Sequence, residues 1–246
     1  MLVDIHNHIL PGLDDGPRTM EEAILLARNA VANGVTHIIA TPHHNHKYSN
    51  NSLKIKEAVL NFNNEISQRE IPIKILPGQE TYFYTSIVDE LKDVILPLAN
   101  SNKYILIELP SNHLPAFLTE ILLQIQLKGY KPIIAHPERN SVLRKEKNLL
   151  FELVNNGALM QINASSLIGM NGYKLKKYTK DLVNHNLVHF ISSDAHNTTS
   201  RPFLLKEAYQ YVGKKFSKQL MNYFNDNAKY VLLGKDFQPW KPISYV

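Results

Sequence analysis

The sequence contains no cysteine, and this absence removes two classes of site. A chain without thiols can form neither disulfides nor thiolate metal sites. Any bound metal must therefore be held by imidazole nitrogen and carboxylate oxygen. That donor set suits manganese, iron, zinc or magnesium.

Long apolar runs and a secretory leader are also missing. The N-terminus reaches a charged residue, Asp4, without a basic segment followed by an apolar stretch, so a signal peptide is not expected. No uncharged apolar run approaches the roughly 18–20 residues that span a bilayer. We therefore expect a cytoplasmic protein with no membrane insertion.

Charge of one sign is not concentrated anywhere in the chain. The formal net charge is +5 and the pI is near 9.1, which mildly favours anionic partners. The basic runs at 144–147 and 174–177 are typical of solvated helix faces, so no nucleic-acid partner is expected. No repeat, low-complexity tract or Gly/Ser linker divides the chain, and one domain over residues 1–246 is expected.

What is present is an alternation of short apolar runs, rich in β-branched residues, with amphipathic segments. The clearest helix begins at Thr19, which forms a capping box with Glu22, and stops before Gly34. Its expected apolar face comprises Ile24, Leu25, Ala27 and Val31. Seven strands alternating with helices predict parallel pairing, in a closed barrel or an open doubly wound sheet. The expected strands are 2–5, 35–40, 73–77, 104–108, 132–135, 158–163 and 188–192.

Histidines and carboxylates gather where the expected strands end, which is where parallel β/α folds build active sites. His6 and His8 are two residues apart, so on an extended segment they point the same way, and Asp194 and His196 repeat this spacing. Burying so many ionisable groups without cations would cost several kcal/mol per unpaired charge. The placement favours a barrel with a metal site at its mouth. The other candidate ligands are Asp14, His43, Glu80, Glu108 and His136.

Further polar residues lie beside these candidates. His44 is expected behind the ligands or against the substrate, and Asp15 is expected to shape its loop or to stand behind a ligand. Arg139 and Arg201 are expected at the rim, where a guanidinium can bind phosphate oxygens in pairs. Five histidines are not expected to bind metal, His37 because it lies within a strand and four others because they fall in loops or on the surface. Those four are His46, His113, His185 and His189.

Several short motifs together resemble the PHP (polymerase and histidinol phosphatase) superfamily. They are Asp4–His8 (DIHNH), 10–16 (LPGLDDG), 41–44 (TPHH), 136–139 (HPER) and 193–196 (SDAH). The resemblance is greatest to the bacterial manganese-dependent protein-tyrosine phosphatases of the CpsB/CapC/YwqE type, and it covers the chain to beyond Arg201. It implies a distorted TIM-like (β/α)7 barrel of mostly parallel strands, with the metal site at its C-terminal mouth.

The resemblance also implies three divalent metal ions per chain, with manganese preferred over iron, zinc or magnesium. The first ion would be held by His6, His8, Glu80 and Asp194, the second by Asp14, His43 and His196, and the third by Glu108 and His136, with Glu80 bridging. Other PHP branches often have histidine at the positions of Asp14 and Glu108. The carboxylates found here agree with the tyrosine-phosphatase branch.

The activity implied is hydrolysis of phosphotyrosine by a metal-bridging hydroxide, with Arg139 and Arg201 binding phosphoryl oxygens and His44 a candidate acid. No cysteine is available for the thiolate route of ordinary tyrosine phosphatases. The expected partner is a phosphotyrosine protein, a bacterial autophosphorylating tyrosine kinase that regulates capsular or exopolysaccharide synthesis.

Four alternatives remain open on the sequence. Another PHP phosphoesterase, acting on histidinol phosphate or nucleotides, would have the same metal ligands. An amidohydrolase-type barrel also begins with His-x-His, but it usually bridges its metals with a modified lysine where Glu80 stands here. A nucleic-acid processing module is compatible with the basic pI. A purely structural metal protein is disfavoured by the two arginines.

Overall fold

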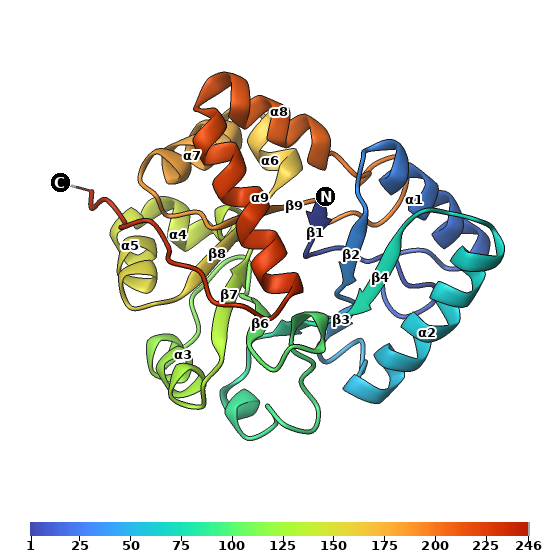
Figure 1. The fold of residues 1–246 in the computed structure, drawn as a ribbon. Coiled ribbons are helices and arrows are strands. Elements are labelled where there is room, and N and C mark those ends of the chain that lie inside the picture. The colour runs from blue at the N-terminus through green and yellow to red at the C-terminus, as the bar shows by residue number, and fades with distance from the viewer. Residues whose placement is uncertain (246) are drawn as a thin grey trace.

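The computed structural model of the protein describes residues 1–245, in which strands and helices alternate (Figure 1). The strands are β1 Val3–Asp4, β2 His37–Ala40, β3 His43–His44, β4 Lys74–Pro77, β5 Glu80–Tyr82, β6 Tyr104–Glu108, β7 Lys131–Ala135, β8 Leu159–Asn163 and β9 Phe190–Ser192. The helices are α1 Met20–Ala32, α2 Ser52–Gln68, α3 Leu118–Leu127, α4 Ser141–Lys145, α5 Lys147–Asn155, α6 Ala164–Ile168, α7 Tyr173–Asn184, α8 Leu205–Lys215 and α9 Lys218–Leu232.

The strands form a distorted parallel barrel, as the sequence predicts. A three-stranded sheet has the order β1-β2-β4, and a six-stranded sheet has the order β3-β5-β6-β7-β8-β9. Each strand pair within them is parallel. An isolated parallel bridge between Asn7 and Ala195 joins the end of β1 to the end of β9. With β2–β3 and β4–β5 taken as interrupted strands, seven strand positions surround one interior.

The two interrupted strands were not foreseen from the sequence. Between β2 and β3 lies Pro42, which has no N–H to donate to a neighbouring strand. Between β4 and β5 lies Gly78, where an added Cβ would stand 2.7 Å from Ile39 Cγ2 and 2.9 Å from Leu98 Cδ2. The chain therefore bends at these points. As a result, His43 and Glu80 lie opposite each other on β3 and β5 instead of directly following a strand.

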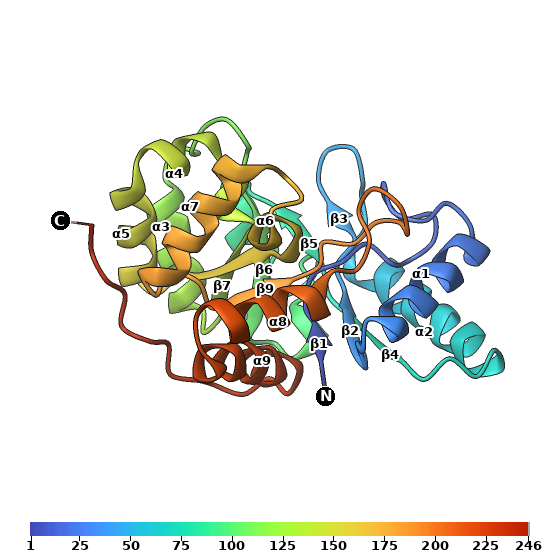
Figure 2. The same cartoon turned by 90° about the horizontal axis from the view of Figure 1, so that it is seen from above.

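The barrel interior is apolar, and α9 closes it at the end where the strands begin (Figure 2). The interior cluster of buried side chains includes Ile5, Ile39, Leu106, Ile133 and Phe190 from the strands and Ala228 and Val231 from α9. Because α9 blocks this end, the polar residues at the ends of the strands face solvent only on the opposite side. The barrel is thus a packed core with one open mouth.

Helix α1 begins as predicted but turns a different face inward. The Thr19 side chain accepts a hydrogen bond from the Glu22 N–H at 3.3 Å, whereas the Glu22 carboxylate accepts from Arg18 N and not from Thr19. Leu25 was expected in the core, but it is 58% exposed, and Leu26 is buried in its place. Leu26 lies on one face with Ala23, Ala27 and Ala30, and the small side chains allow the helix to approach the sheet closely.

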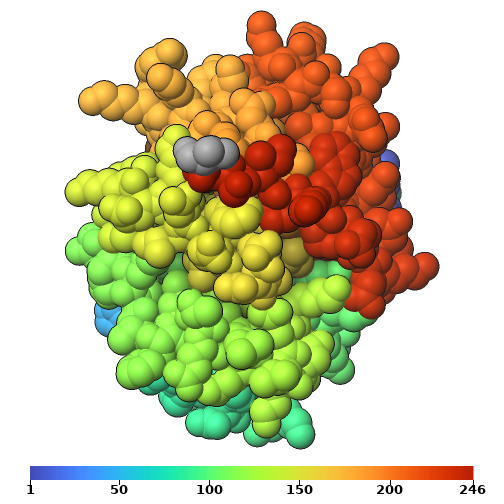
Figure 3. Space-filling view, turned by 90° about the vertical axis from the view of Figure 1, so that its left-hand side faces the viewer, coloured from blue at the N-terminus to red at the C-terminus, as the bar shows by residue number. Residues whose placement is uncertain are grey.

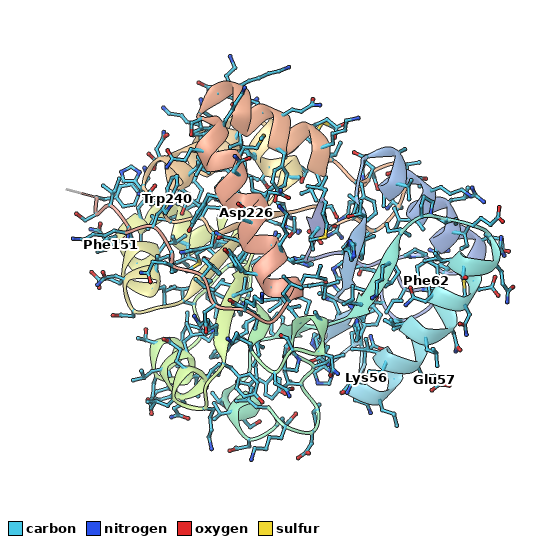
Figure 4. All side chains as sticks on the ribbon, viewed as in Figure 1. Lys56, Glu57, Phe62, Phe151, Asp226 and Trp240 are labelled. Atoms are coloured by element: carbon cyan, nitrogen blue, oxygen red, sulfur yellow. The ribbon has the colours of Figure 1, made fainter. Side chains whose placement is uncertain are left out.

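The C-terminal segment, residues 235–245, runs along the outside of the barrel. Phe237 packs edge-on against Phe190, with ring centroids 5.6 Å apart. Trp240, which is labelled in Figure 4, stacks on Tyr223 with ring centroids 4.5 Å apart. Tyr245 then reaches α7, where its hydroxyl donates to Asp181. Figure 3 shows this red segment between the yellow-green region of α4 and α5 and the orange α7. Within residues 1–245, no helix combines the length and the apolar character needed to cross a membrane.

Candidate metal centre

The Glu80 carboxylate lies at the centre of a buried polar cluster at the barrel mouth. Its Oε1 is 3.2 Å from His6 Nε2, and its Oε2 is 3.2 Å from His8 Nε2 and 2.9 Å from His43 Nδ1. On the side of β7, His136 Nε2 lies 3.0 Å from Oε1. His6, His8 and Glu80 have no exposed surface. One carboxylate therefore touches four ligand candidates from three strand positions, β1, β3 and β7.

Around Glu80 the described residues form four groups whose donor atoms lie within 4.8 Å of one another. Glu80 is the residue shared by the group that contains His136 and the group that contains Glu108, and His136 Nε2 also lies 3.9 Å from Glu108 Oε1. The groups are His6, His8 and Asp194; His6, Glu80 and His136; His43, Glu80 and Glu108; and His8, Asp15, His43 and His196. Eight of the nine predicted ligands are in these groups, and Asp14 is not.

Several donor atoms in the cluster are buried and have no hydrogen-bond partner. They are Glu80 Oε2, His43 Nδ1 and His196 Nε2. The short approach of His43 to Glu80 lacks hydrogen-bond geometry, although the atoms are close. Leaving such groups unsatisfied costs about 1–3 kcal/mol each. Divalent cations between these nitrogen and oxygen atoms would satisfy them, so the donor set fits the metal centre that the motifs imply.

Hydrogen bonds on the far side of three imidazole rings direct their Nε2 atoms toward the cluster. His6 Nδ1 is 2.8 Å from Gln161 Oε1, His8 Nδ1 is 2.7 Å from Asp14 Oδ2, and His196 Nδ1 is 3.0 Å from the Asp194 carbonyl. Because these partners are acceptors, each Nδ1 carries the proton. In the neutral ring, the Nε2 lone pair can then bind a cation placed within the cluster.

The two adjacent aspartates exchange the roles expected of them. The prediction made Asp14 a ligand, but its carboxylate holds the outer nitrogen of His8 and accepts from the N–H groups of Gly16 and His43. Asp15, predicted to shape the loop, instead places Oδ1 3.3 Å from His196 Nε2 and 3.4 Å from His43 Nε2. The structure thus puts Asp15, and not Asp14, among the candidate ligands.

Asp194 connects the cluster to both predicted arginines. Its Oδ1 is 3.6 Å from His6 Nε2. Arg201 Nη2 donates to both of its oxygens at 2.9 Å, and Arg139 Nη1 donates to Oδ2 at 3.1 Å. Both guanidiniums remain partly exposed, at 46% for Arg139 and 36% for Arg201. They form a positive rim beside the buried donors.

Strand β8 contributes two side chains that the sequence argument did not single out. Besides binding His6, Gln161 donates from Nε2 to Asn163 Oδ1 at 3.1 Å. Asn163 in turn donates from Nδ2 to Asp194 Oδ2 at 2.7 Å. Both amides are buried. Two polar residues two apart in the apolar strand LMQIN were the available signal, because side chains at i and i+2 of a strand share a face.

Electrostatic coupling lowers the pKa of two carboxylates of the cluster, Glu80 and Asp194. Burial alone would raise the pKa of Glu80, but His6 and His43 hold it well below its usual value. The pKa of Asp194 is likewise lowered, because hydrogen bonding to His8 and attraction to His6 and Arg201 outweigh burial. By contrast, burial and the nearby Glu80 charge raise the pKa of Glu108. A cluster of this kind attracts cations.

The backbone at two candidate ligands is held in an unusual conformation. His136 has φ +30° and Asp194 has φ +52°, although neither is glycine. Such conformations cost about 1–3 kcal/mol each, and they cluster at functional sites. Asp4 stabilises the turn at Asp194, because its buried carboxylate accepts hydrogen bonds from the backbone N–H and the hydroxyl of Ser193.

The structure agrees with the predicted positions of some of the remaining histidines and not with others. His44 is half-buried on β3, its Nδ1 has no hydrogen-bond partner, and it belongs to none of the four groups within residues 1–245. His46 and His113 are exposed, as predicted. His189 was predicted at the surface or in a loop, but it is 1% exposed, and its Nδ1 accepts from Met160 N at 3.0 Å.

A cavity of about 440 Å³ opens beside the cluster. Asp194, Arg139 and Arg201 line it on the side of the cluster, and Met170 and Leu204 form an apolar wall. Its size is within the roughly 300–1,000 Å³ of typical small-molecule sites. The site therefore combines buried metal donors, a cationic rim and room for an organic group.

Comparison with known proteins gives consistent results. A family described as "Capsular polysaccharide synthesis, CpsB/CapC" matches residues 2–233. Tyrosine-protein phosphatase YwqE of Bacillus subtilis is 41% identical over 245 residues, covering 98% of this chain and 96% of the relative. A putative tyrosine-protein phosphatase CapC of Staphylococcus aureus is also 41% identical, over 95% of this chain and 90% of its own length.

A solved structure matches along the whole chain. It is described as YwqE from Bacillus subtilis and CpsB from Streptococcus pneumoniae, unique metal-dependent tyrosine phosphatases. Its TM-score to this protein is 0.97, with 40% sequence identity and complete coverage of both chains. The likeness extends over the barrel and its mouth alike.

Proposed function

Because the chain belongs to the CpsB/CapC family of capsular polysaccharide synthesis proteins, we propose that it is a metal-dependent protein-tyrosine phosphatase. The observation that carries the proposal is the set of buried nitrogen and oxygen donors without partners, adjoining two arginines and a cavity. A structural metal site would need the donors but not the cationic rim. The resemblance noted from the motifs leads to the same activity.

We assign the metal ions to nine donors in the four groups around Glu80. They are His6, His8, Asp15, His43, Glu80, Glu108, His136, Asp194 and His196. Manganese, with three ions per chain, is the proposed content. When bound, divalent ions lower the pKa of bound water and neutralise phosphate charge. Such help matters here, because phosphate monoesters are among the slowest biological hydrolyses.

The arginines orient the substrate phosphoryl group. An arginine has five N–H donors, and Arg139 uses one of them on Asp194 while its side chain stays nearly half exposed. Arg201 also contacts Asp194 and stands 3.6 Å from Asp15, so its charge lies over the cluster. Their remaining donors would bind phosphoryl oxygens and stabilise the charge that develops there.

The cavity wall fits an aryl leaving group. Met170, Leu175 and Leu204 offer apolar surface beside the arginines, against which a tyrosyl ring would lie. Tyrosine has a pKa near 10, so its oxygen needs less protonation on departure than an alkoxide does. Half-buried His44, next to His43, does not line this cavity, so we propose it as a contact behind the metal donors and not with the leaving group.

We propose that the substrate is a phosphotyrosine protein in the cytoplasm, namely an autophosphorylating tyrosine kinase that regulates capsular or exopolysaccharide synthesis. The family description and the names of the relatives support this class of substrate. The cavity is open to solvent at the barrel mouth, so a phosphotyrosine on a flexible segment could enter it.

The test measures metal content and phosphatase rate together for Asp194→Ala and His136→Ala. Each variant should lose metal and at least about a hundredfold in rate, because positioned metal-site groups contribute several kcal/mol. Asp93→Ala, at an exposed aspartate, and His46→Ala, at an exposed histidine, are matched controls. Retention of both metal and activity in either cluster variant would refute the assignment.

Substrate class is tested by comparing turnover of a phosphotyrosine peptide, histidinol phosphate and nucleotides by the metal-loaded protein. We expect the phosphotyrosine peptide to be turned over with the highest kcat/KM. Preference for either of the other two would make the protein a different phosphoesterase with the same metal centre.

A further inference from the structure

A third arginine, Arg144, lines the cavity beside the metal centre. It lies on the short helix α4, five residues after Arg139. Its Nη1 donates to the Arg139 carbonyl at 3.1 Å and to the Glu138 carbonyl at 3.3 Å. These two bonds fix the guanidinium against the turn that carries Arg139, so its position is linked to the rim of the site.

The three arginines of the cavity differ in how their charge is balanced. Arg139 and Arg201 both form ion pairs with Asp194. Arg144, within the described part of the chain, has no carboxylate oxygen within 4.0 Å, and its two bonds go to neutral carbonyls. A fixed guanidinium with an unbalanced charge and unused donors is suited to bind an oxyanion.

The surroundings of Arg144 provide room for such a group. The cavity is about 440 Å³ and extends from Asp194 to Asn171 and Ser165, whose side chains add polar surface. Asn171 Nδ2 is 3.3 Å from Ser165 Oγ, which orders this part of the wall. A cavity of this volume has room for more than a phenyl phosphate.

On the basis of the proposed function, we propose that Arg144 forms a second anion subsite, which binds a carboxylate or phosphate on a residue flanking the phosphotyrosine. The phosphoryl group under hydrolysis lies between Arg139 and Arg201, and the flanking anion pairs with Arg144. Arg144 is thus a specificity residue that selects peptides with acidic or phosphorylated neighbours.

The plainer reading is that Arg144 only caps the two carbonyls at the turn. Capping explains the two hydrogen bonds that Arg144 Nη1 donates. It does not explain why the Arg144 side chain lines the cavity. It also predicts no dependence of turnover on the sequence of the peptide. The two readings therefore differ in a measurable way.

The experiment compares phosphotyrosine peptides that differ at one flanking position, which is glutamine, glutamate or phosphoserine, scanned over two positions on each side. We expect the wild-type kcat/KM to be about three- to tenfold higher for an anionic peptide than for its glutamine counterpart, as for a partly exposed arginine–oxyanion pair. The glutamate and phosphoserine peptides separate the two sources of the anion.

Two variants with the same loss of charge identify the residue responsible. In Arg144→Gln the ratio of anionic to neutral kcat/KM should fall toward one. Lys145→Gln, at the exposed neighbour on α4 that does not line the cavity, should keep the wild-type ratio. Arg144→Lys should keep part of the preference, since it retains the charge without the fork.

Three results would overturn the inference. They are a wild-type protein indifferent to flanking anions, equal losses of preference in the two glutamine variants, and an Arg144→Gln protein with the wild-type ratio. The wild-type comparison stands even if Arg144→Gln does not fold. Turnover of the neutral peptide separates failure of the proposed function from failure of the subsite. If the neutral peptide is not hydrolysed, the proposed phosphatase activity is refuted. If all peptides are hydrolysed equally well, only the Arg144 subsite is refuted.

Discussion

Asp14 and Asp15 show how neighbouring identical residues acquire different tasks from the backbone that carries them. Gly16 packs so closely on the segment after β1 that an added Cβ would stand 2.1 Å from the His8 carbonyl oxygen. This close approach turns Asp14 toward His8 Nδ1 and leaves Asp15 over His43 and His196. The amino-acid sequence alone does not indicate which of the two carboxylates faces the cluster.

Asp15→Asn and Asp14→Asn should therefore have different effects on metal binding. We expect Asp15→Asn to lose one bound ion per chain, because it removes a charged donor. Asp14→Asn should keep the full number of ions but bind them about 10–100-fold more weakly, as for partners behind metal ligands. Elemental analysis gives the number of ions per chain in each variant, and a metal titration gives its metal affinity. The reverse pattern would restore Asp14 as the ligand.

His189 is a buried neutral base, and burial lowers its pKa to about 3 from the usual 6.5. The unfolded chain takes up a proton at this residue below pH 6.5, whereas the folded chain does not until about pH 3. Its contribution to stability is thus complete above pH 6.5 and declines as the pH falls through that window.

His189→Asn should flatten this decline. The asparagine oxygen can accept the Met160 N–H that His189 Nδ1 accepts in the folded protein, and it does not titrate. Urea unfolding of the wild-type and His189→Asn proteins between pH 7 and pH 4 gives the difference between their free energies of unfolding at each pH. A difference that is constant with pH would show that His189 does not titrate on unfolding.

At the scale of elements, the seven strands and most members of the donor cluster could be predicted, because strand ends and i, i+2 spacing depend on local sequence. Three features could not. The break at Gly78 depends on close contacts with Ile39 and Leu98, which are distant in the sequence. The burial of His189 depends on the β8–β9 pairing and on α9, whose Asn227 donates to its carbonyl. Leu25 and Leu26 are adjacent, and the rotation of α1 against the sheet selects between them.

Strand β8 should matter to metal binding although none of its residues is a ligand candidate. Asn163→Ala removes the 2.7 Å hydrogen bond to Asp194 and leaves the Gln161 amide with one partner fewer. We expect metal affinity to fall about 10–100-fold and the free energy of unfolding to fall by about 1–3 kcal/mol. Asn155→Ala, at an exposed site on α5, is the control. Unchanged metal affinity would show that Asn163 has only a packing role.

At the scale of the whole molecule, the two ends of the barrel have separate tasks. One end carries the metal donors. The other end is closed by α9 and by Phe237, whose ring contacts the rings of Phe190 and Tyr104. The Tyr104 hydroxyl also donates to the Lys235 carbonyl at 2.6 Å. The C-terminal segment, which carries no recognisable motif, thus supports the core.

Phe237→Ala should lower stability without affecting the metal centre. Loss of a partly buried aromatic ring at the base of the core should cost about 1–3 kcal/mol. Asp236→Asn, which removes only exposed ion pairs with Lys103 and Lys131, should have a smaller effect. Chemical denaturation and metal analysis on the same samples test both statements. Loss of metal in Phe237→Ala would mean that the two ends are coupled.

The sealed base also determines how the centre exchanges its contents. His6, His8 and Glu80 are fully enclosed, whereas Asp15 is 44% and Glu108 22% exposed, so the cluster is reached from the open mouth of the barrel, where the cavity lined by Arg139 and Arg201 also lies. Metal loading, substrate entry and phosphate departure must all pass through this mouth. Inorganic phosphate bound between Arg139 and Arg201 should therefore slow the stripping of metal by a chelator, because the phosphate occupies part of the mouth through which the chelator reaches the ions.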